Sequence, residues 1–428
     1  MASGGDRARL LLLIPTTTYR AEAFVEAARE LDVDLTVASE HDSTFSLAEP
    51  DKLLTLDFTD PRRAAEQVKV FARDYPLAAV FGVDDHTAVV AAHVSAELGL
   101  RHNPVAAVEA AGDKHRQRVL LQRHGIRVPK FRLLSFDSDV KQAGRQVTYP
   151  CVLKPVHLAA SRGVIRVDDA VEFGQTVQRV RAITDRAGPA AAAWATQGMI
   201  AEDYVPGPEF ALEGWIEGGE LDVLALFDKP DPLEGPYFAE TLYVAPSRFP
   251  DAVQVELVAC AQSAARAVGL ETGPVHVELR YNDEGPWIIE LAARPIGGKC
   301  GQVLRFGADG SVTLEQLLLG RALGRFEATP KRPPGAVAVM MIPVPVAGTL
   351  DRVIGTAAAR AVPHVTDVIV TVHRGQELVP LPEESRYAGF ILARGETPEV
   401  VERAVREANE MIEFVVGSAL EDAAGSAR

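Results

Sequence analysis

The feature that most constrains the fold is a pair of apolar, β-branched runs that each carry one glutamate. Glu278 stands in residues 275–280, Glu290 stands in residues 287–290, and a turn typical of hairpins, residues 282–285, separates the two runs. A carboxylate among apolar residues is rarely buried unless it is paired or binds a metal. We therefore predict two adjacent strands that bring both acids to one place, where hard oxygen donors suit Mg²⁺. The alternative is a half-exposed position for each acid on an edge strand.

The N-terminal part alternates short apolar runs with amphipathic helical patterns. Strands are expected at residues 10–14, 33–38 and 78–83, and helices at residues 20–31 and 87–98. This alternation predicts a doubly wound parallel sheet, which we expect to occupy residues 1–104. Residues 15–18, Pro-Thr-Thr-Thr, follow the first strand where a dinucleotide-binding enzyme would have GxGxxG. A Rossmann-type dehydrogenase is therefore disfavoured.

The remaining chain predicts two further parts, residues 105–331 and residues 332–428, with a lid subdomain at about 146–205. In the first part we expect helices on both sides of residues 112–114, a strand at 148–155, a helix at 168–186 and an exposed connection near 188–193. Closely spaced antiparallel strands follow at residues 199–205, 209–217 and 221–227, then a helix at 253–268. The last part is strand-rich, with strands at 336–344, 365–372 and 388–393 and a helix at 398–414.

Several cationic and small residues accompany the two acids. Arg294 follows the second acid in Ala-Ala-Arg-Pro-Ile-Gly-Gly, where its guanidinium can grip a carboxylate or an acyl phosphate. Lys154 ends an apolar strand, where it either reaches solvent or points into a cleft at an anion. The loop 159–163 after it is not a Walker A motif, although its backbone N–H groups can bind phosphate.

Composition excludes several classes of protein. The chain has 428 residues, a formal net charge of −15 and three scattered cysteines. The negative charge disfavours non-specific binding to nucleic acid or to an anionic membrane, and the cysteines form neither a zinc motif nor a disulfide framework. No apolar stretch approaches the roughly 18 residues of a membrane span. We expect a protein of the reducing cytoplasm.

Taken in order along the chain, these motifs resemble the ATP-grasp superfamily over roughly residues 105–305. The resemblance is carried by Asp113-Lys114, by Leu153-Lys-Pro155 and by the pair HVELR and IIELAARPIGG. It implies a pre-ATP-grasp domain, an ATP-grasp fold of two α+β subdomains and a strand-rich C-terminal part. It also implies an ADP-forming ligase that activates a carboxylate as an acyl phosphate and transfers it to an amine.

The resemblance implies a role for each matching residue. The residues it assigns to ATP are Lys114 and Lys154 at the α- and β-phosphates, Ser161 and Gly163 in a lid loop over the β- and γ-phosphates, Glu202, Tyr204 and Val205 at the adenine, and Glu209 at the ribose. Glu278 and Glu290 would bind Mg²⁺, or Mn²⁺ in its place, and Arg294 would stabilise the acyl phosphate. Ala292 stands where the family often has a metal-binding Asn.

Within the superfamily, ELAARPIGG and the long tail look most like the bacterial L-amino acid ligases and related carboxylate–amine ligases. That likeness implies small-molecule carboxylate and amine substrates, at least one of them an amino acid, and a homodimer is common among similar proteins. The residues it places in the substrate pocket are Glu240, Tyr243, Asp228, Lys229, His276, Gly297 and Gly298. Glu240 matches the acid that recognises a substrate amino group, and Tyr243 stands where a His is common.

Two other functions remain open from the sequence. A carboxylase of the purine-synthesis type would consume ATP in the presence of bicarbonate. A non-catalytic nucleotide-binding protein would bind ATP and release no ADP. Taken alone, Glu202 and Glu209 also fit an ordinary acidic turn, and His276 fits a structural role.

Overall fold

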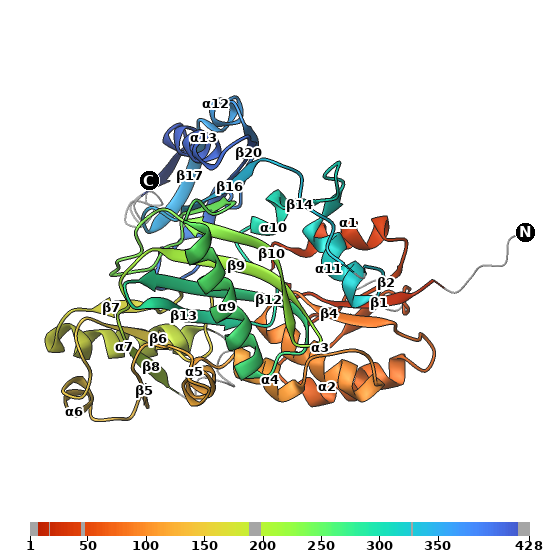
Figure 1. Cartoon of the computed structure of the whole chain (residues 1–428), viewed down its shortest axis with the longest axis horizontal. Helices are drawn as coiled ribbons and strands as arrows, with labels where there is room; N and C mark the ends of the chain where they lie inside the picture. The colour runs from red at the N-terminus through yellow and green to blue at the C-terminus, as the bar shows by residue number, and fades with distance from the viewer. Residues whose placement is uncertain (1–6, 17, 44–47, 188–197, 327, 418–428) are drawn as a thin grey trace, which may run out of the picture.

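The computed structural model describes residues 7–16, 18–43, 48–187, 198–326 and 328–417, and Figure 1 shows their arrangement. Three larger sheets organise the chain: a parallel sheet near the N-terminus, a long antiparallel sheet through the centre, and a smaller antiparallel sheet beside it. The expected connection at residues 188–193 lies outside the described residues. No helix among the described ranges is both long and apolar enough to cross a membrane.

The N-terminal sheet is parallel, as the alternating pattern predicts. Its strands run in the order β3 (Leu53–Thr55), β2 (Asp34–Ser39), β1 (Arg9–Leu13) and β4 (Ala79–Gly82), and its helices are α1 (Ala21–Glu30), α2 (Pro61–Phe71) and α3 (Asp85–Leu98). Leu10 to Leu13 are fully buried because helices cover both faces of β1. Asp84 caps α3 by accepting from the backbone N–H of Thr87. The cap fixes the start of a helix that contributes to the site described below.

The central antiparallel sheet joins the middle of the chain to its C-terminal part. Its strands, in order, are β13 (Gly285–Ala292), β12 (Thr272–Asn282), β9 (Glu209–Glu217), β10 (Glu220–Lys229), β11 (Leu242–Ala245), β16 (Ala336–Pro343), β20 (Tyr387–Gly395) and β18 (Val365–Val370). The helices around it are α9 (Asp251–Val268), α10 (Cys300–Val303), α11 (Leu314–Ala322), α12 (Thr356–Arg360) and α13 (Pro398–Glu410). Since β11 pairs with β16, the two parts share one continuous sheet.

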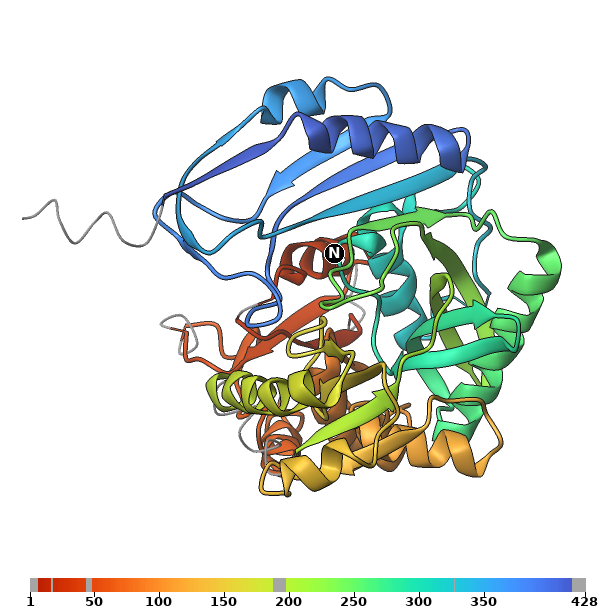
Figure 2. The same ribbon diagram turned by 90° about the vertical axis from the view of Figure 1, so that its left-hand side faces the viewer.

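The smaller antiparallel sheet forms a separate layer, drawn in yellow tones in Figures 1 and 2. Its strands run in the order β5 (Phe131–Leu134), β8 (Met199–Asp203), β6 (Cys151–Pro155) and β7 (Ile165–Val167). Helices α6 (Val140–Gly144) and α7 (Ala170–Arg186) pack together on this layer, and α4 (Val105–Ala111) and α5 (Lys114–Arg123) precede it in the chain. The layer includes most of the stretch expected to form a lid, about 146–205, and begins earlier in the chain, at Phe131; below it is called the lid layer.

Some elements differ from the expectation. The helix predicted to reach residue 414 ends at Glu410, and the chain continues as β21 (Glu413–Gly417). This strand pairs with β17 (Gly348–Ile354), which also pairs with β19 (Glu377–Leu378). The sequence prediction was wrong there because pairing between segments far apart in the chain decides the conformation. The pattern also missed α2, β3 and the short pair β14 (Arg305–Phe306) and β15 (Val312–Thr313).

Truncating Leu12 to Ala should destabilise the N-terminal sheet. Leu12 is fully buried, so the change should lower the free energy of unfolding by about 2–5 kcal/mol. Urea denaturation followed by far-UV circular dichroism measures this loss. The matched control is Val70→Ala in α2, whose side chain is 59% exposed and should cost little. Equal losses in both variants would contradict the packing described here.

Candidate functional site

The two glutamates of the hairpin lie directly opposite each other. Glu278 of β12 and Glu290 of β13 are partners in the strand register, with a bulge immediately after Glu278. Their side chains are 19% and 27% exposed, and both line one cleft. β13 is an edge strand, so the edge-strand alternative is right about the position of Glu290. It does not leave the acid on an open surface, because the lid layer faces it across the cleft.

The cleft, about 670 Å³ in volume including its open mouth, lies between the central sheet and the lid layer. Of the residues expected to bind ATP or metal, it is lined by Lys114, Lys154, Ser161, Glu202, Tyr204, Val205, Glu209, Glu278 and Glu290. Glu240 also lines it. Distant stretches of the chain therefore converge on one cavity.

Glu202 is held at the cleft by two cations. Its side chain is 2% exposed, and its carboxylate lies 2.7 Å from Lys154 Nζ and 2.6 Å from Arg118 Nε. Burial raises the pKa of Glu202, but Arg118 and Lys154 outweigh burial and lower it to about 2. Sequence reasoning did not assign Arg118 a role, although it stands on α5 one turn after Lys114. The Lys154–Glu202 pair also settles that Lys154 points into the protein rather than to solvent.

Lys114 approaches the hairpin from the other side. Its Nζ donates to the carbonyl oxygen of Leu158 at 2.7 Å and lies 3.7 Å from Glu290 Oε2. Lys114 is therefore held between the loop after β6 and one of the paired acids. Lys114 and Lys154 contact different acids of the same cavity, which spreads positive charge along its length.

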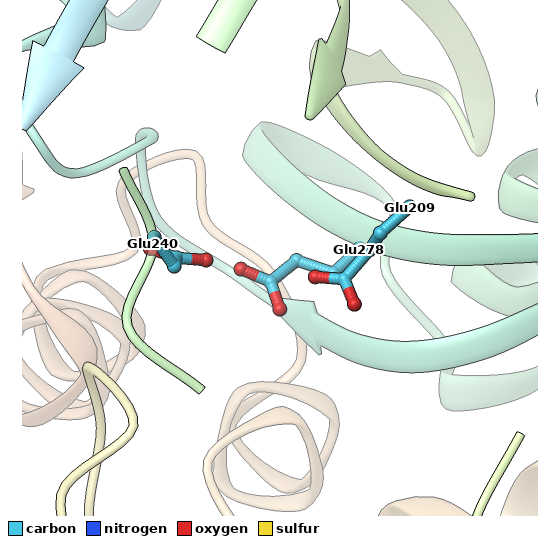
Figure 3. A group of neighbouring side chains, drawn as sticks. All are labelled: Glu209, Glu240 and Glu278. Carbon is cyan, nitrogen blue, oxygen red and sulfur yellow. The ribbon is translucent and has the colours of Figure 1, made fainter. Parts of the chain in front are cut away.

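A buried lysine joins three acids at the inner end of the cleft. Lys229 Nζ lies 2.8 Å from Glu209, 2.5 Å from Glu240 and 3.3 Å from Glu278, and its side chain is 2% exposed. Burial lowers the pKa of Lys229, but the three carboxylates outweigh burial and hold it well above its usual value. Figure 3 shows Glu240 reaching toward Glu209 and Glu278 from a separate segment of chain.

Oxygen atoms of Glu209, Glu240 and Glu278 lie within 4.8 Å of one another, as the ligands of a metal ion do. This group shares Glu278 with the metal pair expected from the sequence and does not include Glu290. The Lys229 ammonium contacts all three of these acids, whereas Glu290 has the more distant Lys114 as its ion-pair partner among the described residues. The hairpin pair Glu278 and Glu290 is thus the better place for a divalent cation.

Arg280 was also missed by the sequence reasoning. Its Nε donates to Glu209 at 2.8 Å, its Nη1 to the carbonyl oxygen of Val205 at 2.6 Å and its Nη2 to that of Leu233 at 2.5 Å. One guanidinium therefore ties the expected ribose acid to the expected adenine segment. The only available signal was an arginine two residues after Glu278, which places both on one strand face.

Arg294 is held by an acid from the N-terminal sheet's helix. Its Nε lies 3.0 Å from Oδ2 of Asp85, which is in the first turn of α3. Burial lowers the pKa of Arg294, but Asp85 and then Glu290 outweigh burial and raise it. Burial likewise raises the pKa of Asp85, and Arg294 brings it below the usual value. Nothing near Asp85 in the sequence indicated this partnership, because the two residues are far apart in the chain.

His276 lies behind the acids rather than in the cavity. Its Nε2 is 3.5 Å from Glu278 and its Nδ1 is 4.0 Å from Glu213. Burial, with the nearby charges of Arg294 and Lys229, lowers the pKa of His276 to about 3, so the ring is neutral near pH 7. Burial also raises the pKa of Glu213 well above its usual value. His276 is therefore suited to support Glu278.

The other expected substrate residues differ in position. Tyr243 is 2% exposed, and its ring lies 5.0 Å from Lys229 Nζ. Gly298 donates its backbone N–H to the hydroxyl of Tyr19 at 2.7 Å, and Gly297 lies beside the same tyrosine. Asp228 is not brought to the cleft: successive side chains of β10 point to opposite faces, so Asp228 accepts from Arg248 while Lys229 joins the acids.

The lid loop is fixed by the C-terminal part. Gly163, at φ +71°, donates its N–H to the carbonyl oxygen of Pro382 at 2.9 Å. Arg162 donates to the carbonyl oxygen of Glu383 at 2.8 Å and pairs with Glu384 at 3.0 Å. A Cβ at position 163 would lie 2.8 Å from the ring of Pro155, so this turn requires glycine.

Comparisons with known families agree with this geometry. Residues 25–102 match the ATP-grasp N-terminal domain, residues 147–303 match the ATP-grasp domain, and residues 340–417 match the L-amino acid ligase C-terminal domain 2. The structure of an L-amino acid ligase from Bacillus licheniformis is similar with a TM-score of 0.82, at 26% identity, over 97% of this chain and 100% of that one.

Curated relatives include an alanine–anticapsin ligase from Bacillus subtilis, 27% identical, and a human carnosine synthase, 28% identical. The alignments cover 52% and 64% of this chain, respectively. The chain spans only 49% of the first relative and 35% of the second. An uncharacterised protein from Sinorhizobium fredii is 24% identical over 93% of this chain and 82% of its own length.

The pKa of Glu202 makes a prediction about acid stability. A carboxylate whose pKa falls from 4.5 to about 2 on folding stabilises the protein above pH 4.5, and this contribution is lost as the pH falls toward 2. The full contribution is about 3 kcal/mol, as an order of magnitude. Glu202→Gln should therefore unfold with a weaker pH dependence between pH 5 and 3, measured by urea denaturation. The control Glu220→Gln alters an exposed ion pair and should keep the wild-type slope; an unchanged slope in Glu202→Gln would refute the assignment.

Proposed function

Because the chain belongs to the ATP-grasp superfamily, we propose that it is an ADP-forming carboxylate–amine ligase with an amino acid as at least one substrate. The observation that carries this proposal is the single cleft in which Lys114 and Lys154 face the opposed acids Glu278 and Glu290. Two cations beside two metal-binding carboxylates suit a triphosphate. The named ligases among the similar proteins support the same reaction class.

A carboxylate is a poor electrophile, so a ligase of this kind must activate it before an amine can attack. A substrate carboxylate oxygen attacks the γ-phosphorus of ATP, the bond to the β–γ bridging oxygen breaks, and ADP leaves. The amine nitrogen then attacks the acyl carbon, the carbon–oxygen bond to phosphate breaks, and inorganic phosphate leaves as the nitrogen loses a proton. Both steps depend on positioning and on neutralising charge rather than on a protein nucleophile.

The residues divide this work by their positions. Lys154 and Lys114 are placed to contact the phosphates, and Ser161 lies in the lid loop that covers the same cavity. Arg294 has a fixed orientation because Asp85 holds its Nε and the carbonyl oxygen of Pro295 accepts from its Nη1, so its Nη2 group can face the acyl phosphate. Closure of the lid layer over the cleft would exclude water, which would otherwise hydrolyse the acyl phosphate.

A divalent cation fits the hairpin acids. Glu278 and Glu290 present carboxylate oxygens from directly paired strand positions, and hard oxygen donors are what Mg²⁺ prefers. A bound Mg²⁺ would supply charge neutralisation for the transferred phosphoryl group. Ala292 is buried and provides no ligand, so this chain's own contribution comes from the two glutamates.

Glu240 is the proposed contact for the substrate amino group. It reaches the cleft and shares the Lys229 ammonium with Glu209 and Glu278. Burial raises the pKa of Glu240, and Lys229 lowers it without cancelling the rise. A second cation at this carboxylate, such as a substrate ammonium, would therefore be stabilised. Tyr243 and the Gly297–Gly298 loop lie on the same side and would form the adjoining pocket wall.

Removing either metal acid or the arginine should abolish turnover. We expect Glu278→Gln, Glu290→Gln and Arg294→Ala each to lower amine-dependent ADP release by about a hundredfold or more, because each removes charge stabilisation from the reacting phosphoryl or acyl group. A coupled ADP assay over a pool of amino acids and small carboxylates measures the rate. Glu377→Gln, an exposed acid on β19, serves as the matched control.

The same assay tests the reaction class. Identification of ADP supports an acyl phosphate, whereas AMP would contradict it. ADP release that requires bicarbonate instead of an amine would favour a carboxylase. Near-normal turnover by Glu290→Gln would refute the metal assignment while leaving the fold untouched.

A further inference from the structure

A second cavity lies away from the ATP cleft and has a different charge. It is a hollow of about 880 Å³, including its open mouth, between α10, β14 and the ends of β18 and β20. Arg305 and Arg394 line it together with the side chains of Gln302 and Thr366. In Figure 1, α10 and β14 lie beside each other on the side of the molecule opposite the lid layer. No residue assigned above to ATP, metal or substrate lines this hollow.

More arginines than acids line this hollow. Arg305, Arg394 and the neighbouring Arg332 form no ion pair within the described part of the chain. Burial lowers the pKa of Arg394, with a further decrease from Arg305. Burial also lowers the pKa of Arg332, with a further decrease from Arg394. The three cations are therefore close enough to repel one another, in a chain whose net charge is −15.

Each lining arginine is already oriented by the backbone. Nη1 of Arg305 donates to the carbonyl oxygens of Gln302 and Leu304, both at 2.9 Å, and Nη2 of Arg394 donates to that of Val303 at 2.8 Å. A guanidinium has five N–H donors. The Nε and the other terminal nitrogen of each arginine make no hydrogen bond within the described residues. The backbone bonds thus fix two guanidinium planes and leave donors for a ligand.

One acid also lines the hollow. Asp309 accepts from the backbone N–H of Ser311 at 3.1 Å and forms no ion pair within the described residues. This hydrogen bonding lowers the pKa of Asp309, so its carboxylate stays ionised. Glu315 is influenced by Arg305 as well, but it is buried among Arg20 and Lys299 and does not line the hollow. The local balance therefore remains positive.

We propose that this hollow, which we call the Arg305–Arg394 site, binds a small molecule through a phosphate group. A phosphate dianion matches two guanidinium planes, and each plane can donate two parallel hydrogen bonds to it. Ligand binding would replace the repulsion between the arginines with attraction. The site is joined to the reaction centre by sequence, because α10 begins directly after the loop that carries Arg294 and Gly298.

Equilibrium dialysis of the full chain against labelled inorganic phosphate tests the proposal. Saturation with Mg²⁺ and a non-hydrolysable ATP analogue keeps phosphate out of the cleft. We expect one phosphate per chain to remain bound. Arg394→Gln and Arg305→Gln should each weaken its binding about tenfold or more, because each removes a charge-assisted donor pair. Asp309→Asn should tighten binding about twofold to fivefold, because it removes a repelling charge.

The controls separate a binding site from a merely structural role. Arg374→Gln makes the same change of charge at an exposed arginine paired with Asp351 and should leave binding unaltered. Arg394→Lys keeps the charge and loses the planar fork, so its binding should fall between wild type and Arg394→Gln. Circular dichroism monitors folding, and if one arginine variant unfolds, the other and Asp309→Asn decide. No retained phosphate, or affinity unchanged across these variants, would show that the arginines only hold the carbonyl groups of α10.

Discussion

The structure of the site depends on one buried cation. Lys229 has almost no exposure, yet three glutamates from β9, β12 and the segment before β11 meet at its ammonium group. We assign each acid a different ligand, namely the ribose, the metal ion or the substrate amine. Three carboxylates could not share this space without a cation, because their mutual repulsion at low solvent exposure would be prohibitive. Lys229 therefore offsets the electrostatic repulsion between the three glutamates.

The proposed reaction centre is assembled from parts that are distant in the sequence. The N-terminal sheet contributes Asp85, the central hairpin contributes Glu278 and Glu290, and the lid layer contributes Lys154. Each contact is an ion pair or hydrogen bond of low exposure rather than a broad apolar surface. Such contacts fix the orientation of the side chains. Orientation matters more than the strength of packing where charge must develop at a defined atom.

The acids and lysines that line the cleft could be singled out from local sequence patterns. Glu278 and Glu290 stood out as charged residues in apolar strands, and their facing register follows from a short turn. The parallel N-terminal sheet followed from strand–helix alternation.

The sequence did not show which residues hold the acids and cations of the cleft in place. No sequence pattern indicated the partners of Asp85, Arg118 and Arg280, and only the folded chain places them against Arg294, Glu202 and Glu209. Asp228 was misplaced because side chains along a strand alternate between its two faces, so adjacent residues diverge.

The hydrogen bond from Gly163 to Pro382, with the neighbouring contacts of Arg162, ties the loop proposed to cover the phosphates to a segment more than half the chain away. The two segments contact each other directly, although they match different family models. Recombination between related enzymes would separate them unless both come from the same parent. An engineered chimera should therefore keep this loop and the segment that holds it from one parent, because the proposed nucleotide site relies on both.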